Sequence, residues 1–162
     1  AKSSYDKLIR MTSDCLDDMA RGEVTETVER VIFTALATTG VISGIARGSN
    51  QTALAHKFYE CTRKLYPEAS RPYLHGEIVG VGLLLQNHFS GEVDKNEFFI
   101  NMMKKYGMPS SIGELDIQNS ESTKEQYFDF LSNSSSIDKT NQAELKKLRE
   151  SLDYLFLVKG EN

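Results

Sequence analysis

The sequence has few of the features that mark secreted, membrane-spanning or nucleic-acid-binding proteins. Its 162 residues include only two cysteines, Cys15 and Cys61, too few for a disulfide framework, so a reducing cytoplasm is the expected compartment. No uninterrupted apolar run approaches the roughly 18 residues of a membrane span, so we expect no membrane segment. The net charge of −4 gives no electrostatic attraction to nucleic acid or to an anionic membrane.

Proline is equally scarce, and the three prolines, Pro67, Pro72 and Pro109, leave long stretches in which helices can form. A content of 40% hydrophobic and 26% charged residues is typical of a soluble globular protein, and the length suits one domain. We find no internal repeat and no convincing strand. The sequence therefore predicts an all-α fold, with residues 1–162 forming a single helical domain.

Apolar side chains recur at steps of three and four residues, which is the period of a helix with one buried face. Thr25 is the expected cap of the second helix, and Ser49 or Asn50 the expected cap of the helix that carries His56. The remaining helices are placed by the same pattern and by their flanking Gly and Pro residues. We expect helices over about 4–20, 26–42, 75–88, 93–106, 123–131 and 142–158, with one short helical turn at 112–115.

The helix over 75–88 is the most apolar segment, and Gly91 is expected to close it. It contains Gly80 and Gly82, each of which costs about 1 kcal/mol relative to alanine inside a helix. Glycines in a buried helix indicate a tight contact between helices or a small gap for a ligand.

His56 and His75 are the candidate functional residues. Burying an imidazole without a partner costs roughly 1–3 kcal/mol, so a histidine at the start of an apolar helix must form a hydrogen bond or bind a ligand. Zinc is held by neutral imidazole nitrogens at about 2.0–2.1 Å, and a catalytic zinc site uses three protein ligands. The spacing alone fits two metal ligands, and it also fits one surface and one core histidine.

The motif Ala55-His56, followed by His75-Gly76-Glu77 and an apolar helix containing glycine, resembles the iron-containing alcohol dehydrogenase superfamily. The glycerol dehydrogenase branch is the nearest, and the resemblance runs over about 29–117. It implies a helical bundle like the C-terminal domain of these enzymes, which dehydroquinate synthase shares. It also implies that His56 and His75 are ligands of one divalent metal, zinc or iron.

In that family a third metal ligand, an aspartate, and a Rossmann-like half that binds NAD precede this region. The resemblance therefore implies that the chain is a C-terminal fragment of a cytoplasmic, homo-oligomeric enzyme that oxidises a small alcohol or polyol such as glycerol. We assign no catalytic and no cofactor-binding residue within 1–162. We expect the isolated chain to be inactive and to expose apolar side chains around the helix over 75–88.

Two related activities and one different class remain open. The 3-dehydroquinate synthases and glycerol-1-phosphate dehydrogenases typically carry a histidine four residues before the first ligand, where this chain has Thr52. This difference favours the glycerol dehydrogenase branch without excluding the other two. An inactive helical interaction fragment is the alternative outside enzymes.

Three further groups have structural interpretations. Glu77 lies in the first turn of its helix, where a carboxylate stabilises the unpaired N–H groups, and a bond to a metal ligand is the alternative. We expect His88 to lie on the surface and Asp14, Asp17 and Asp18 to form a solvated face.

Overall fold

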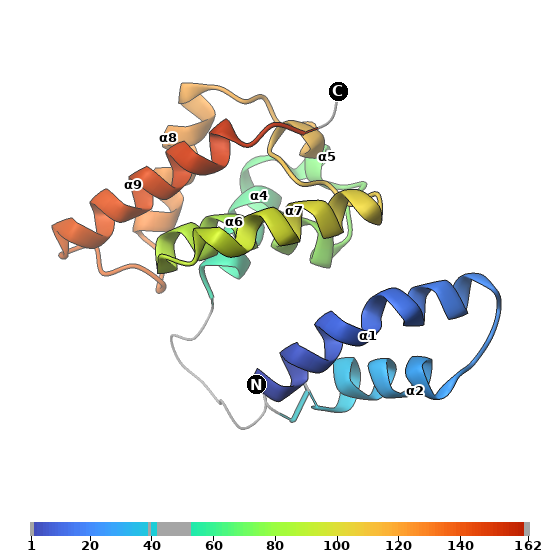
Figure 1. Cartoon of the computed structure of the whole chain (residues 1–162). Coiled ribbons are helices and arrows are strands. Elements are labelled where there is room, and N and C mark those ends of the chain that lie inside the picture. The colour runs from blue at the N-terminus through green and yellow to red at the C-terminus, as the bar shows by residue number, and fades with distance from the viewer. Residues whose placement is uncertain (1, 39, 42–52, 161–162) are drawn as a thin grey trace. The chain divides into compact units, whose positions relative to one another are not determined.

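The computed structural model describes residues 2–38, 40–41 and 53–160, and every regular element in these ranges is a helix (Figure 1). The predicted all-α class is confirmed. The chain divides into two compact units, 1–49 and 50–162. A single helical domain over 1–162 stays a prediction. Among the described helices, none combines the length and the apolarity that a membrane crossing needs.

The first unit contains α1 (Lys2–Ala20) and α2 (Glu26–Phe33), which pack against each other. The hydroxyl of Thr25 accepts a hydrogen bond from the Val28 N–H at 3.3 Å, so the predicted cap is confirmed. The predicted helix over 26–42 is interrupted, because residues Thr34–Thr38 form the π-helical turn η1, and residue 42 lies outside the described residues.

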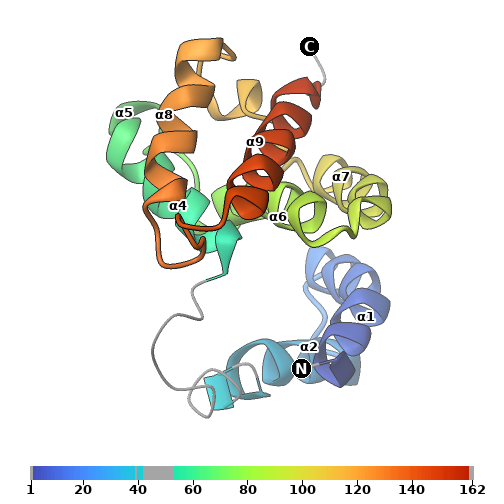
Figure 2. The same ribbon diagram turned by 90° about the vertical axis from the view of Figure 1, so that its left-hand side faces the viewer.

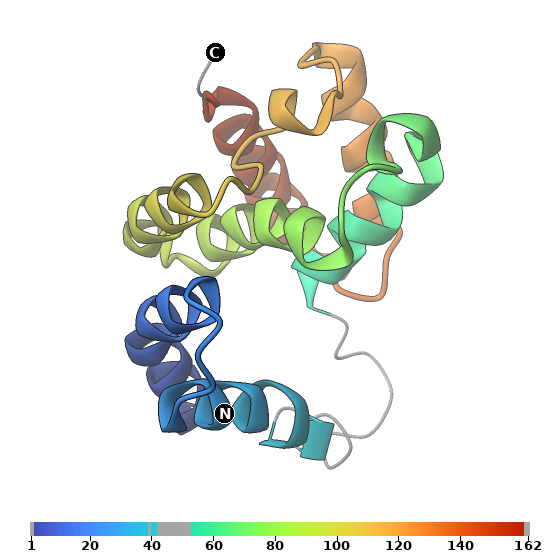
Figure 3. The same cartoon turned by 90° about the vertical axis from the view of Figure 1, so that its right-hand side faces the viewer.

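The second unit is organised around α4 (Leu54–Leu65) and α6 (His75–Ser90), which make the most extensive pair among the described helices. The helix α8 (Glu121–Ser132) packs on α4, and α9 (Gln142–Leu157) packs on both α6 and α8 (Figures 2 and 3). The core between them consists of fully buried apolar side chains, which include Phe58, Ile78, Val81, Leu84, Leu85, Tyr127, Leu131, Leu148, Leu152 and Leu155.

Gly82 lets α4 and α6 approach each other closely. A Cβ atom at this position would lie 2.7 Å from the carbonyl oxygen of Ala55 and 3.0 Å from its Cα. At Gly80 the nearest atom to an added Cβ would be the terminal methyl of Met103, at an ordinary 3.5 Å. The predicted tight contact is therefore confirmed for Gly82, while Gly80 has room for a methyl group.

The remaining elements connect these helices. A single turn, α5 (Pro67–Ser70), lies between α4 and α6, and Gly91 ends α6 in the left-handed region at φ 77°, as predicted. The predicted helix over 93–106 is divided into a 3-10 turn, η2 (Val93–Lys95), and α7 (Asn96–Lys105). The expected turn at 112–115 is confirmed as η3 (Gly113–Leu115).

The start of α4 lacks a side-chain cap of the kind that Thr25 gives to α2. Its N-cap is Ala53, which makes no side-chain capping hydrogen bond. The predicted caps, Ser49 and Asn50, lie outside the described residues.

Candidate metal site

His56 and His75, the two predicted metal ligands, lie next to each other at the crossing of α4 and α6. His56 is in the first turn of α4 and directly follows Ala55, the residue that contacts Gly82 on α6. His75 is the first residue of α6. The centroids of the two imidazole rings are 5.4 Å apart, and the ring planes are tilted by 47°. The helix pair thus brings together two side chains that are 19 residues apart in the sequence.

This separation fits two ligands of one metal ion. An imidazole nitrogen lies about 2.0–2.1 Å from a bound zinc and about 1 Å from its own ring centre, so two rings on one tetrahedral zinc have centroids roughly 5 Å apart. Within 2–38, 40–41 and 53–160, no group of three His, Cys, Asp or Glu side chains could hold a metal ion. His56 and His75 are therefore two candidate ligands, one fewer than the three protein ligands of a catalytic zinc site.

Both histidines are exposed to solvent, so the prediction that His75 is buried was wrong. The apolar pattern of the helix over 75–88 indicated that its first residue would be buried and would need a partner. In the structure α6 begins at the surface, and Leu74 before it is 73% exposed. Because water can satisfy the polar atoms of the His75 ring, the ring does not need a ligand. The case for a metal therefore depends on the proximity of the two rings.

A tyrosine and an arginine continue this arrangement along α4. The ring of Tyr59 meets the ring of His75 edge to face, with centroids 4.4 Å apart. The guanidinium carbon of Arg63 lies 5.4 Å from the centroid of the Tyr59 ring. His56, Tyr59 and Arg63 follow at steps of three and four residues, which is one face of a helix. Sequence reasoning missed Tyr59 and Arg63, although this spacing was visible in the sequence.

Glu77 stabilises the beginning of α6. Its carboxylate accepts a hydrogen bond from the Leu74 N–H at 2.5 Å. This contact satisfies a donor that has no partner within the helix and places a negative charge at the positive end of the helix dipole. The predicted structural role of Glu77 is confirmed. An added Cβ at Gly76 would meet no atom within 4 Å, so the neighbourhood of His75 is open on that side.

A hollow of about 370 Å³ is lined in part by Tyr73 and Glu77, which lie two residues before and two residues after His75. The hydroxyl of Tyr73 donates a hydrogen bond to the carbonyl oxygen of Glu114 at 2.6 Å. Partial burial and the nearby carboxylates of Asp116, Glu77 and Glu114 raise the pKa of Tyr73, so its phenol stays protonated at neutral pH. The lining residues are Tyr73, Glu77, Lys104, Gly107, Met108, Pro109 and Glu114.

The third histidine connects α6 to α9. His88 was predicted to lie on the surface, but it is half-buried at the end of α6. Its Nδ1 and the hydroxyl of Ser151 on α9 form a hydrogen bond of 2.9 Å, and its ring stacks on Tyr154 with centroids 4.7 Å apart. The prediction was wrong because α9 packs along the part of α6 that carries His88.

The cysteine on α4 is unsuited to metal binding or nucleophilic attack. Cys61 is fully buried, and burial raises the pKa of its thiol from 9.0 to about 12. The thiolate is the form that binds metals and attacks substrates, so a thiol with this pKa is inert at neutral pH.

Asp18, on α1, is only partly solvated, unlike the exposed face predicted for it. Its carboxylate accepts a hydrogen bond from the hydroxyl of Thr25 at 2.6 Å and pairs with Arg21. Asp18 therefore links the end of α1 to the N-cap of α2 through this hydrogen bond.

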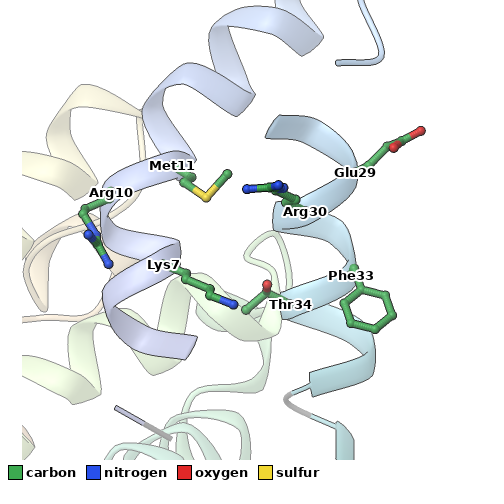
Figure 4. A pocket seen from close by; sticks show the side chains of 7 residues that line it. All are labelled: Lys7, Arg10, Met11, Glu29, Arg30, Phe33 and Thr34. Atoms are coloured by element: carbon green, nitrogen blue, oxygen red, sulfur yellow. The ribbon is translucent and has the colours of Figure 1, made fainter. Parts of the chain in front are cut away.

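A larger hollow, of about 670 Å³, lies between α1 and α2 (Figure 4). Figure 4 shows Lys7 directed toward Thr34 and Arg30 directed toward Met11, across the space between the two helices. Its lining of Lys7, Arg10, Met11, Glu29, Arg30, Phe33 and Thr34 contains neither histidine nor cysteine. Its one carboxylate, on Glu29, is a single ligand where a catalytic zinc site takes three, and three cationic side chains line the same hollow.

Comparisons with known proteins relate the chain to oxidoreductases. Hydroxycarboxylate dehydrogenase A of Escherichia coli K12 is 23% identical over 155 residues, which are 96% of this chain and 39% of that protein. Glycolaldehyde reductase of Halobacterium salinarum is 30% identical over 122 residues, which are 75% of this chain and 32% of that protein. No family model matches the chain, and no solved structure matches it.

These similarities agree with the oxidoreductase class indicated by the sequence. The chain spans less than half the length of either relative. Neither relative is named a glycerol dehydrogenase, so the glycerol dehydrogenase branch stays a prediction.

Proposed function

We propose that this chain supplies two metal ligands to an oxidoreductase of the iron-containing alcohol dehydrogenase superfamily. The proposed reaction transfers hydride between a small hydroxylated substrate and NAD, which is bound mainly outside this chain. The observation that carries the proposal is the 5.4 Å separation of the His56 and His75 rings. The names of the two relatives support a hydroxy acid or a hydroxyaldehyde as the substrate, and the family resemblance supports an alcohol or polyol.

His56 and His75 would hold the divalent metal, zinc or iron, through neutral imidazole nitrogens. An ion held there would supply Lewis-acid chemistry, which would make the hydroxyl group of the substrate easier to deprotonate. Both histidines are ligands in this proposal, and neither acts as the general base. Their exposure at the surface leaves room for a third ligand and for substrate.

The experiment is a zinc titration by isothermal calorimetry of the chain and of His56→Ala, His75→Ala and His88→Gln. We expect weak binding of one zinc ion to the unaltered chain, because only two protein ligands and water would hold it. Either ligand variant should lose this binding, and His88→Gln should retain it because His88 contacts Ser151 and Tyr154 instead. Zinc binding that persists after both ligand histidines are replaced would refute the proposal.

In the full-length protein, His75→Ala should remove most of the metal and nearly all turnover while the helical circular dichroism remains. Reduction of NAD should be assayed with glycerol and with small 2-hydroxy acids. The reverse reaction, oxidation of NADH, should be assayed with glycolaldehyde. Normal turnover of a metal-free variant would contradict the mechanism.

A further inference from the structure

The face of α4 that carries His56 also carries a side chain that binds the chain segment leading to His75. Arg63 is half-buried and lies seven residues after His56, two helical turns along the same face. One of its terminal nitrogens donates to the carbonyl oxygen of Ser70 at 2.6 Å, and the other donates to the carbonyl oxygen of Tyr73 at 2.7 Å. Arg63 therefore fixes the connection between α5 and α6 to α4.

These two carbonyls define the path of the backbone into His75. Ser70 ends α5 and is fully buried, while Tyr73 lies two residues before His75. A planar guanidinium holds two acceptors in a fixed fork, which a lysine ammonium cannot reproduce in the same geometry. The fork therefore restricts both the position and the direction of the segment from which the His75 side chain projects.

Arg63 also contacts the aromatic ring that borders His75. Its guanidinium carbon lies 5.4 Å from the Tyr59 centroid, which is within the range of a cation–π contact. The edge-to-face contact of Tyr59 with His75, at 4.4 Å, then limits rotation of the imidazole. His75 is thus restrained from two directions, through its backbone by the carbonyl contacts and through its ring by Tyr59.

We infer that Arg63 is a positioning residue for the metal ligand His75, acting through the Ser70 and Tyr73 carbonyls and through the Tyr59 ring. This inference rests on the proposed metal site. It also makes a prediction for the protein without metal, because all the contacts that restrain His75 are between protein groups. Arg63 should keep the His75 ring beside the rings of His56 and Tyr59 whether or not a metal is bound.

The test uses the full chain and the variants Arg63→Lys and Tyr59→Leu, with Arg71→Lys as the matched control. Arg71 is an exposed arginine on the same connection, so its replacement makes the same chemical change outside the restraint. Circular dichroism checks that each variant retains its helices. Nuclear Overhauser contacts among the His56, Tyr59 and His75 rings are then measured without metal, and zinc affinity is measured by calorimetry.

We expect Arg63→Lys to lose the ring contacts of His75 and to weaken zinc binding about tenfold, as removing a group that orients a ligand does. Tyr59→Leu should weaken zinc binding in the same direction, and Arg71→Lys should leave both measurements unchanged. Intact ring contacts in Arg63→Lys would overturn the inference, whatever the zinc affinity. Ring contacts that depend on Arg63 in a chain that binds no zinc would support the positioning role and refute the proposed metal site.

Discussion

The close approach of α4 and α6 at Gly82 should be the most sensitive point of the second unit to a single added carbon. In Gly82→Ala the new methyl would meet the Ala55 carbonyl oxygen at 2.7 Å and its Cα at 3.0 Å. These are backbone atoms, so they cannot move aside as the end of a flexible side chain can. The two helices must therefore separate, and His56 moves with Ala55.

Gly80→Ala provides the matched control on the same helix. Both substitutions gain about 1 kcal/mol because alanine is a better helix former than glycine. At Gly80 the added methyl makes an ordinary contact with Met103 at 3.5 Å, so this gain should appear as increased stability. At Gly82 the overpacking, which typically costs about 1–3 kcal/mol, should offset or exceed it. The difference between the two variants removes the shared helix term.

Urea denaturation followed by circular dichroism measures that difference. We expect Gly82→Ala to unfold with a free energy about 1–3 kcal/mol lower than Gly80→Ala. The rings of His56 and His75 should also separate beyond 5.4 Å in Gly82→Ala, so that its zinc binding weakens. Equal stabilities of the two variants would refute the close packing of α4 on α6.

Three further predictions concern the second unit. Tyr127→Phe removes the buried hydrogen bond of 2.8 Å to the Thr62 hydroxyl and should lower the urea-measured stability by about 1 kcal/mol. Burial raises the pKa of the Cys61 thiol from 9.0 to about 12, so above pH 9.0 the thiol loses its proton more readily in the unfolded chain than in the folded one. The free energy of unfolding should therefore be constant below pH 9.0 and decline between pH 9.0 and about 12, by up to about 1.4 kcal/mol per pH unit. A urea series across that pH range should show a smaller decline for Cys61→Ala, and equal slopes would contradict the assignment. Glu77→Gln keeps an acceptor for the Leu74 N–H but removes the charge at the helix N-terminus. The free energy of unfolding should therefore fall by about 0.3–1 kcal/mol, which thermal denaturation measures as a lower midpoint temperature.

Helix positions could be read from the sequence where a strong local signal marked both the face and the end. Gly91 ends α6 with a positive φ, a conformation that glycine adopts at little cost. Thr25 caps α2 through its own hydroxyl, so its role depends on residues within one turn. At Ala53 no capping side chain marks the start of α4, and the predicted caps, Ser49 and Asn50, lie outside the described residues.

The surroundings of each helix face could not be read in the same way. We expected apolar side chains to be exposed around the helix over 75–88. Leu74, directly before α6, is 73% exposed, whereas Ile78, Val81 and Leu84 within the helix are fully buried. They are covered because α6 packs against both α4 and α9. The helical period shows which residues share a face, whereas the neighbours of that face depend on the path of the chain through its connections.

The histidine pair shows the same division between local and long-range information. The motif identified His56, His75 and Glu77, but it did not show which contacts bring the two imidazole rings together. Gly82 sets the distance between the helices, Glu77 stabilises the first turn of α6, and Arg63 directs the backbone into it.

These contacts involve protein groups alone, so we expect them to hold the two rings in place before any ion binds. Metal binding should then cost little rearrangement of this chain, and its affinity should be limited by the number of ligands. A third ligand supplied by the full-length protein should therefore strengthen zinc binding without changing the positions of His56 and His75. A large movement of either ring on zinc addition would show that the site is not preorganised.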